Sequence, residues 1–251
     1  MNKYKLSEET LEIDGHVLHR IIALRDFREV KKGDIGGWIE SQENLLHDGD
    51  CWVYANAKVY GNAEVYGNVK VCGEAMVCDN AKVCGEAMVY GNAEVYGNAE
   101  VYDNAKVCGE AMVYGNVEVC GYATVYSNAK VYGNATVCGD AEVYDYAKVR
   151  GYAKVYSNAK VYGNARVYGI AEVYGNAKVC GNAEVEKKSD YIVFKNRWSS
   201  EKYFTWTRSN DMWSVGCFYG TGEELIKKAY KDSEEKGREY ARIVHHVKSI
   251  K

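Results

Sequence analysis

The sequence has no apolar run long enough to span a membrane, and its opening stretch, MNKYKLSEETLEIDG, lacks the apolar centre of a signal peptide. Neither sign of charge dominates, because 32 lysines and arginines stand against 35 acidic residues, giving a net charge of −3 at pH 7. We therefore expect a cytoplasmic protein with no membrane partner and no direct binding to DNA or RNA. A balanced net charge does not exclude local charged patches.

What the sequence has instead is one repeat. From Val53 to Val185 every sixth residue is valine, 23 in all, and alanine stands two positions before each valine except at Cys51, Val69 and Val117. A period of six leaves no apolar stripe along a helix, whereas residues two apart share one face of a strand. The alanine and valine of each A-x-V unit are therefore expected to point inward, and the residue between them outward.

The three residues after each valine, most often YGN, predict a turn. Glycine enters the left-handed backbone region freely and asparagine tolerates it, so GN at every sixth position indicates a regular corner. A short strand and a corner repeated at constant phase predict an all-β solenoid. An antiparallel meander is the competing arrangement, but identical arms and corners favour stacked coils in which like residues lie on like residues.

Nine cysteines suggest a disulfide framework until their positions are considered, because seven of them occupy the slot after valine that tyrosine fills 14 times. An odd number of cysteines without a secretory signal favours free thiols in a reducing compartment. There is no CxxC motif, and thiols six residues apart would lie at different corners, too far apart to share a metal ion. No metal site is expected.

The unit VYGNA, an aliphatic residue with a small one four positions later, resembles the hexapeptide repeat of left-handed parallel β-helices, the fold of many bacterial acyltransferases. One slot departs from that family, because the residue after the aliphatic one is usually small there and is Tyr or Cys here. The resemblance covers residues 51–186 and implies a left-handed rod with three hexads per coil, about seven to eight coils. Period six alone also permits two hexads per coil. In an 18-residue coil the Cα atoms of Cys120 and Cys138 should lie about 5 Å apart.

The flanks differ from the repeat and predict three domains: a small N-terminal β cap over residues 1–50, the β-helix over 51–186 and an α+β module over 187–251. In the last part, alternation of apolar and polar residues predicts strands within 190–198, 202–208 and 212–218. Thr221 followed by Glu224 predicts a capping box for a helix through about Asp232, and a second helix follows with an apolar face of its own.

The stretch RDFREVKKGDIGGWIESQENL before the repeat, with VGCF and GREY after it, is similar to a family of phage and prophage repeat proteins. These GGWIE-type and GCF-type caps extend the resemblance over nearly the whole chain. It implies a viral or prophage setting and an accessory role such as countering a host defence, and it brings no assigned catalytic residues.

Histidine is absent between His47 and His245. Acyltransferases of the hexapeptide fold use a histidine on the coils as general base, so this absence, with the lack of loops for an acyl donor, predicts that the chain is not an enzyme. Asp140 or Asp145 as a base has no visible partner. The histidines of the flanks, His16 among them, are expected to be ordinary surface or packing residues, and no cofactor is expected.

One stretch, VYDYAKVRGYAKVYS at 143–157, breaks the repeat at several slots. On a three-hexad coil, this stretch and its neighbours gather four cations and three apolar side chains on adjoining parts of the last coils: Lys130, Lys148, Arg150, Arg166, Tyr146, Tyr152 and Ile170. That composition suits an anionic nucleotide or an acidic protein surface. Tyr122 and Asp140 also replace the asparagine of the repeat, but no cations or apolar side chains gather around them. Sequence drift is therefore the competing explanation for the substitutions at 143–157.

These observations favour a phage-encoded protein that binds and inhibits a host defence protein in the bacterial cytoplasm. The alternatives are a sponge that sequesters a nucleotide signal, a hexapeptide-repeat acyltransferase, and a structural or assembly element. The expected partner is accordingly a host protein or a nucleotide ligand, and a homo-oligomer, either trimer or dimer, is expected.

Overall fold

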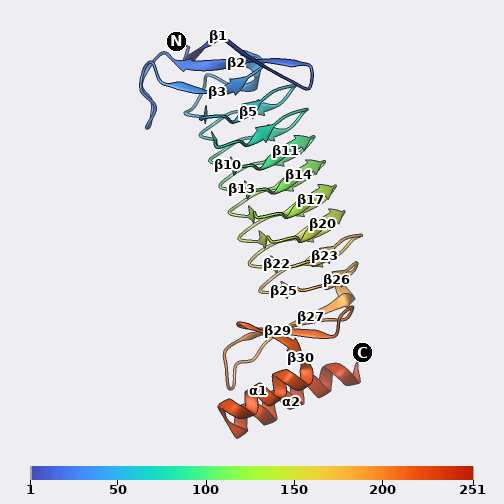
Figure 1. Cartoon of the computed structure of the whole chain (residues 1–251). Helices are drawn as coiled ribbons and strands as arrows, with labels where there is room; N and C mark the ends of the chain where they lie inside the picture. Colours follow the sequence, from blue (N-terminus) through green and yellow to red (C-terminus); the bar gives the residue numbers. More distant parts are fainter. Residues whose placement is uncertain (1, 251) are drawn as a thin grey trace.

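The computed structural model describes residues 2–250 as a rod of stacked coils between an N-terminal β module and a C-terminal α+β module (Figure 1). Met1 and Lys251, the outer ends of the flanking domains expected from the sequence, lie outside the described residues. The rod's strands form three parallel sheets, and every third strand along the chain belongs to the same sheet. The predicted β-solenoid of about eight coils is confirmed.

Each coil contributes one short strand to each sheet. The 11-stranded sheet begins with three strands of the N-terminal module and continues through β5 (Lys58–Val59), β8 (Met76–Val77), β11 (Glu94–Gly97), β14 (Met112–Gly115), β17 (Lys130–Gly133), β20 (Lys148–Gly151), β23 (Arg166–Val167) and β26 (Glu184–Val185). The 8-stranded sheet contains β4 (Trp52–Val53), β7 (Lys70–Val71), β10 (Met88–Gly91), β13 (Lys106–Gly109), β16 (Thr124–Val125), β19 (Glu142–Val143), β22 (Lys160–Val161) and β25 (Lys178–Val179). The 7-stranded sheet contains β6 (Glu64–Val65), β9 (Lys82–Val83), β12 (Glu100–Val101), β15 (Glu118–Val119), β18 (Thr136–Val137), β21 (Lys154–Val155) and β24 (Glu172–Val173).

The coil is 18 residues long, because residues 18 apart are paired in the sheets, as Val89 is with Val107. Cys120 and Cys138 accordingly lie one above the other, with Cα atoms 4.7 Å apart, which confirms the expected coil size. Their sulfur atoms form a disulfide. The expectation of free thiols is therefore wrong for this pair, because like slots of successive coils lie within bonding reach, while the other seven cysteines are free.

The repeat's valines fill the interior of the rod. All of them, from Val53 to Val185, have no exposed surface, and the alanines two positions earlier are buried with them. Burying a valine side chain stabilises a protein by roughly 1.5–3 kcal/mol, so this column is the main source of the rod's stability. Strands of only two to four residues are sufficient because every strand inside a sheet is paired on both sides, and only the strands at the sheet ends have a single partner.

The corners have a left-handed backbone at the residue before the asparagine slot. Gly73 is one example, with φ 72°, and a Cβ there would lie 2.9 Å from the carbonyl oxygen of Gly91 in the next coil. Asp145 occupies the same slot with φ 57°, and its carboxylate accepts a hydrogen bond of 3.1 Å from the amide of Gly163. Asp79 likewise accepts a hydrogen bond from the amide of Gly97, one coil further along the rod. Asp145 is thus an architectural residue.

The N-terminal module joins the rod without a break in the sheet. Strand β2 (His16–Ala23) pairs antiparallel with both β1 (Tyr4–Ile13) and β3 (Ile35–Ile39), and β3 pairs in parallel with β5. Gly37 allows that contact, since a Cβ on it would lie 2.5 Å from the carbonyl oxygen of Ala57. The short 3-10 helix η1 (Gln42–Asn44) follows, and then Leu45 bridges to Val65. Residues 39–45 therefore already begin the solenoid.

The C-terminal module contains η2 (Lys188–Asp190) and the antiparallel strands β27 (Tyr191–Lys195), β28 (Tyr203–Thr207), β29 (Met212–Val215) and β30 (Phe218–Thr221), followed by α1 (Gly222–Asp232) and α2 (Glu234–Ser249). The capping box is confirmed, because Thr221 and Glu224 each accept from the other's backbone amide. The single strand predicted for 212–218 is wrong: Gly216, with φ 60°, turns the chain into a hairpin there. In the described part of the chain, neither helix is long and apolar enough to cross a membrane.

Candidate functional site

The cations expected to form a patch do lie on one face of the rod. In the 11-stranded sheet, Lys130 pairs with Lys148, and Lys148 pairs with Arg166, on the outward side of three successive coils. Elsewhere in the rod that the structure describes, outward like charges stack at most in pairs, such as Glu100 on Glu118. Stacked like charges repel each other, so this row of three raises the free energy of the folded rod unless a counter-charge is supplied.

A counter-charge is present at only one end of the row. Arg166 forms an ion pair of 3.1 Å with Glu184. Among residues 2–250, Lys130 and Lys148 have no ion-pair partner within 4 Å, and the side chain of Lys148 is exposed. The face therefore carries positive charge that the rod itself does not neutralise.

Apolar side chains flank this face at both corners. Tyr146 stands at the corner before Lys148 and is 62% exposed, whereas Tyr152 and Ile170 stand one above the other at the corner after it, 66% and 73% exposed. In the earlier coils this second corner holds asparagines whose side-chain amides donate along the rod, from Asn62 through to Asn134, over distances of 3.0–3.2 Å. Tyr152 ends that ladder. The seven predicted residues are thus brought together as expected, and their binding role stays a prediction.

Arg150 belongs partly to the architecture. It replaces a tyrosine in a ladder whose preceding rings, Tyr96, Tyr114 and Tyr132, stack in parallel at centroid distances of 4.9 and 5.1 Å. The guanidinium carbon of Arg150 lies 5.0 Å from the ring centroid of Tyr168 in the next coil. Arg150 therefore continues the stack as a cation on a ring face and still exposes its charge.

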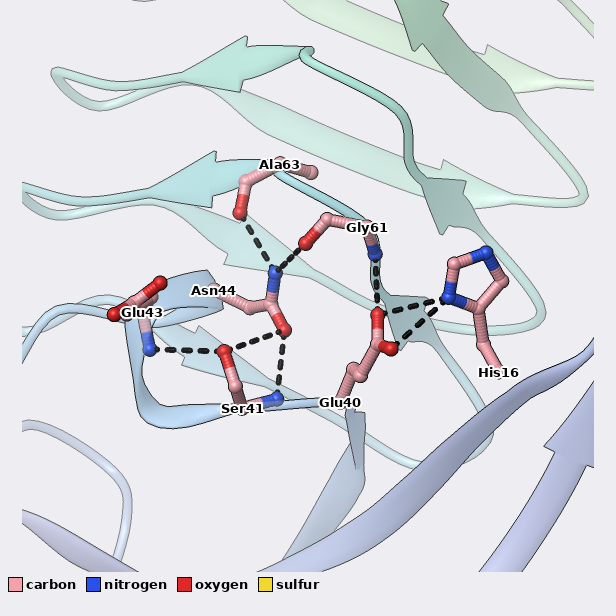
Figure 2. A network of polar contacts seen from close by, with 7 residues as sticks. All are labelled: His16, Glu40, Ser41, Glu43, Asn44, Gly61 and Ala63. Carbon is pink, nitrogen blue, oxygen red and sulfur yellow. Dashed lines mark hydrogen bonds and ion pairs between the residues drawn. The ribbon is translucent and has the colours of Figure 1, made fainter.

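A second cluster, in the N-terminal module, was missed by the sequence reasoning (Figure 2). His16, the first residue of β2, places its Nδ1 atom 3.0 Å from both carboxylate oxygens of Glu40, which directly follows β3. The same carboxylate accepts a hydrogen bond of 2.7 Å from the amide of Gly61, and the ring of His16 lies 5.1 Å from that of Tyr60. The histidine side chain is 37% exposed. Nothing in the sequence pairs two residues 24 apart, because only the β2–β3 hairpin brings them together.

The hydrogen bonds of this cluster keep Glu40 charged. Partial burial opposes ionisation, but the bonds from His16 and from the Gly61 amide prevail and lower the pKa of the Glu40 carboxyl below its usual value. Asn44 holds the neighbouring loop, because its amide nitrogen donates to the carbonyl oxygens of Gly61 and Ala63, both at 2.9 Å. Figure 2 shows Gly61 between the two groups of contacts. A cleft of about 430 Å³ lies beside this loop and is lined by Gly61 and Asn44 among others.

No known family profile matches the chain. A stretch of 62 residues is 42% identical to the "Uncharacterized acetyltransferase YdcK" of Escherichia coli (strain K12), covering 22% of this chain and 19% of that protein. The match thus spans about a fifth of the relative's length. Together with the fold, it fits a hexapeptide-repeat β-helix protein.

This comparison corrects one expectation. The chain was expected not to be an enzyme, and the finding against that expectation is its similarity to a protein that is described as an acetyltransferase. The expectation rested on the absence of histidine from the coils, but the structure places a flanking histidine, His16, against Tyr60 of the first coil. A phage or prophage setting stays a prediction.

Proposed function

We propose that the chain is an acyltransferase in which His16, held by Glu40, acts as the general base. The observation that carries the proposal is the contact of 3.0 Å between the His16 Nδ1 atom and the Glu40 carboxylate. A carboxylate bound to Nδ1–H fixes one tautomer of the imidazole and leaves the Nε2 lone pair free to accept a proton. Among residues 2–250 this is the single ion pair that involves a histidine. The similarity to a described acetyltransferase supports the same reaction class.

The proposed step transfers an acyl group from a thioester to an amine or hydroxyl acceptor. Nε2 of His16 removes the proton as the acceptor attacks the thioester carbonyl. The new bond to the acyl carbon forms, the carbon–sulfur bond breaks, and the proton passes from His16 to the departing thiolate. Glu40 stays ionised throughout and stabilises the imidazolium, for which its lowered pKa is suited.

The test is release of coenzyme A from acetyl-CoA, followed by chromatography, with glucosamine, spermidine and hydroxylamine as acceptors. His16→Asn keeps a donor for Glu40 but has no base, so turnover should fall by about 10²–10⁴-fold while the melting temperature changes little. His246→Asn, which alters a histidine on α2 far from the cluster, should leave turnover unchanged. Turnover that survives in His16→Asn, or acetyl-CoA that is not consumed by the wild type, contradicts the proposal.

A second function, the binding of an acidic protein surface, is favoured by the row of cations with its apolar flanks. The row leaves Lys148 without a counter-charge, and Tyr152 replaces a hydrogen-bonded asparagine with an exposed ring. A phage-encoded inhibitor of a host protein would use the face in this way, with the aromatic and aliphatic side chains as anchors and the cations steering an acidic partner.

Restoring the asparagine of the repeat at positions 152 and 170 is expected to abolish binding without destabilising the rod, so it tests the binding role separately from stability. Tyr152→Asn with Ile170→Asn should extend the amide ladder beyond Asn134 and stabilise the rod by about 0.5–1.5 kcal/mol per added hydrogen bond. The same double variant should lose any host protein that the wild type retains on an affinity column, measured by quantitative mass spectrometry. Tyr122→Asn, at a corner away from the row, is the control. A double variant that retains the same proteins in equal amounts excludes this face as their docking site.

A further inference from the structure

One tyrosine ladder ends in an open ring. Tyr156 and Tyr174 stack at the corner after the 7-stranded sheet, with ring centroids 5.3 Å apart and an angle of 11° between the planes. No coil follows at that corner, because the chain leaves the rod after β26 for η2 and β27. The other two ladders end differently, at the buried Cys180 above Tyr162 and at Glu186 above Tyr168. Tyr174 is 46% exposed.

Tyr174, the last ring of this ladder, lines a cleft. The cleft has a volume of about 410 Å³ and lies between the last coil and the C-terminal sheet. Tyr174 lines it on the rod side, and Val193, Phe194 and Tyr203 line it on the sheet side. Tyr191, which also lines the cleft, donates from its hydroxyl to the carbonyl oxygen of Glu172 at 2.9 Å. That bond ties the wall of the cleft to the last coil, so the space is preformed.

We propose that this cleft binds the planar ring of a nucleobase, stacked on Tyr174 as the next rung of the ladder. Rings already stack along this corner at about 5 Å, and an aromatic face accepts any nucleobase because every base has a π face. A volume of 410 Å³ lies within the range of small-molecule sites, and aromatic and aliphatic side chains dominate the lining, as such sites require. Tyr174 and Phe194 provide rings on opposite sides of the cleft.

The phosphate that a nucleotide would carry has a cation within reach. Lys188 lines the same cleft, is 61% exposed, and pairs with the Glu172 carboxylate at 2.8 Å. Glu172 is 30% exposed and so only partly buried, and the more exposed ammonium of Lys188 can also contact a phosphate from the solvent side. The site is distinct from the His16 cluster, because the seven strand spacings between β5 and β26 set the two about 33 Å apart. A result that excludes nucleobase binding in this cleft would therefore not contradict the proposed acyl transfer.

Calorimetric titration of the full chain with AMP, GMP and UMP, and with adenosine and guanosine, tests the proposal. We expect at least one of these probes to bind with Kd below about 1 mM. Tyr174→Ala should weaken that binding roughly 5- to 150-fold, as loss of a stacked base contact does, and Tyr174→Phe should change it less than about 3-fold. Lys188→Gln should weaken only the phosphorylated probes, which distinguishes a nucleotide from a nucleoside.

Tyr122→Ala is the matched control, since it removes a tyrosine that is 66% exposed on the rod and distant from the cleft. If Tyr174→Ala fails to fold, Tyr203→Ala and saturation-transfer NMR of the wild type, with ring protons of the probe receiving saturation, give the same answer. The proposal is overturned if no probe binds at 5 mM. It is also overturned if Tyr174→Ala binds as the wild type does, or if Tyr122→Ala loses binding equally.

Discussion

Cys120 and Cys138 hold successive coils together through a disulfide, at a point where the Cα atoms are 4.7 Å apart. The loop that it closes is one whole coil of 18 residues. Closing a loop of that size stabilises the folded state by about 3 kcal/mol in the chain-entropy description. The disulfide therefore joins the corners that follow β15 and β18, two neighbouring strands of the 7-stranded sheet.

Thiol titration checks this bond. Under denaturing conditions without reductant, seven free thiols should react with Ellman's reagent, because nine cysteines are present and two are joined. After reduction, nine should react. Cys120→Ser should lower the melting temperature to that of the reduced wild type, whereas Cys72→Ser, which alters a free thiol in the same repeat slot, should not. Nine reactive thiols in protein purified without reductant would contradict the pairing.

The inward column of valines makes a second prediction. Val119 has no exposed surface and lies between Val101 and Val137 in the neighbouring coils. Val119→Asp buries a carboxyl group without a partner, which costs several kcal/mol, a large part of the roughly 5–15 kcal/mol of total stability of a typical domain. Cooperative unfolding, followed by circular dichroism, should disappear. Glu118→Gln, one residue away on the outward face, should melt within about 2 °C of the wild type, since surface changes cost little.

Much of the rod could be predicted because every hexad meets the same local structural requirements. The alternation of inward Ala and Val with an outward residue needs only strand geometry, and the corners need only a residue that accepts positive φ. The 18-residue coil could not be derived from period six and came from the resemblance to known β-helices. The pairing of Val89 with Val107 settled it.

The flanks could be predicted less well, because their contacts do not repeat. His16 and Glu40 come into contact only because β2 and β3 pair, and no spacing in the sequence predicts that pairing. The residues of the irregular stretch around residue 150 have different structural roles. Asp145 serves the corner, and Arg150 continues a ladder, whereas Tyr152 interrupts one.

The asparagine ladder makes a third prediction. Asn98 accepts a hydrogen bond from Asn80 at 3.2 Å and donates one to Asn116 at 3.0 Å. Asn98→Ala removes both, and because the site is exposed to water we expect a loss of about 1 kcal/mol, or 2–4 °C in melting temperature. Asn104→Ala is the control, since in the described chain that side chain has no ladder partner. Equal losses in the two variants would show that the ladder contributes nothing of its own.

The tyrosine ladders make the rod sensitive to alkali. Tyr144 stacks between Tyr126 and Tyr162 at centroid distances of 4.8 and 4.9 Å. Burial, and then the nearby charge of Glu142, raises the pKa of Tyr144 to about 12, against about 10 in an unfolded chain. Since the folded state holds the proton more tightly, the stabilisation is complete below pH 10 and is lost as the pH rises toward 12.

Denaturant melts at pH 8, 10 and 11.5 should therefore show a stability that is constant up to about pH 10 and falls above it, while absorbance at 295 nm reports tyrosinate. Tyr144→Phe keeps the stack and has no proton to lose, so its stability should fall less between pH 10 and pH 11.5. Tyr122→Phe, at a tyrosine that is 66% exposed, should fall as the wild type does. Ionisation of all 23 tyrosines with a midpoint near pH 10 before any unfolding would mean that the ladder rings are solvated, and the stacks would then contribute nothing to alkaline sensitivity.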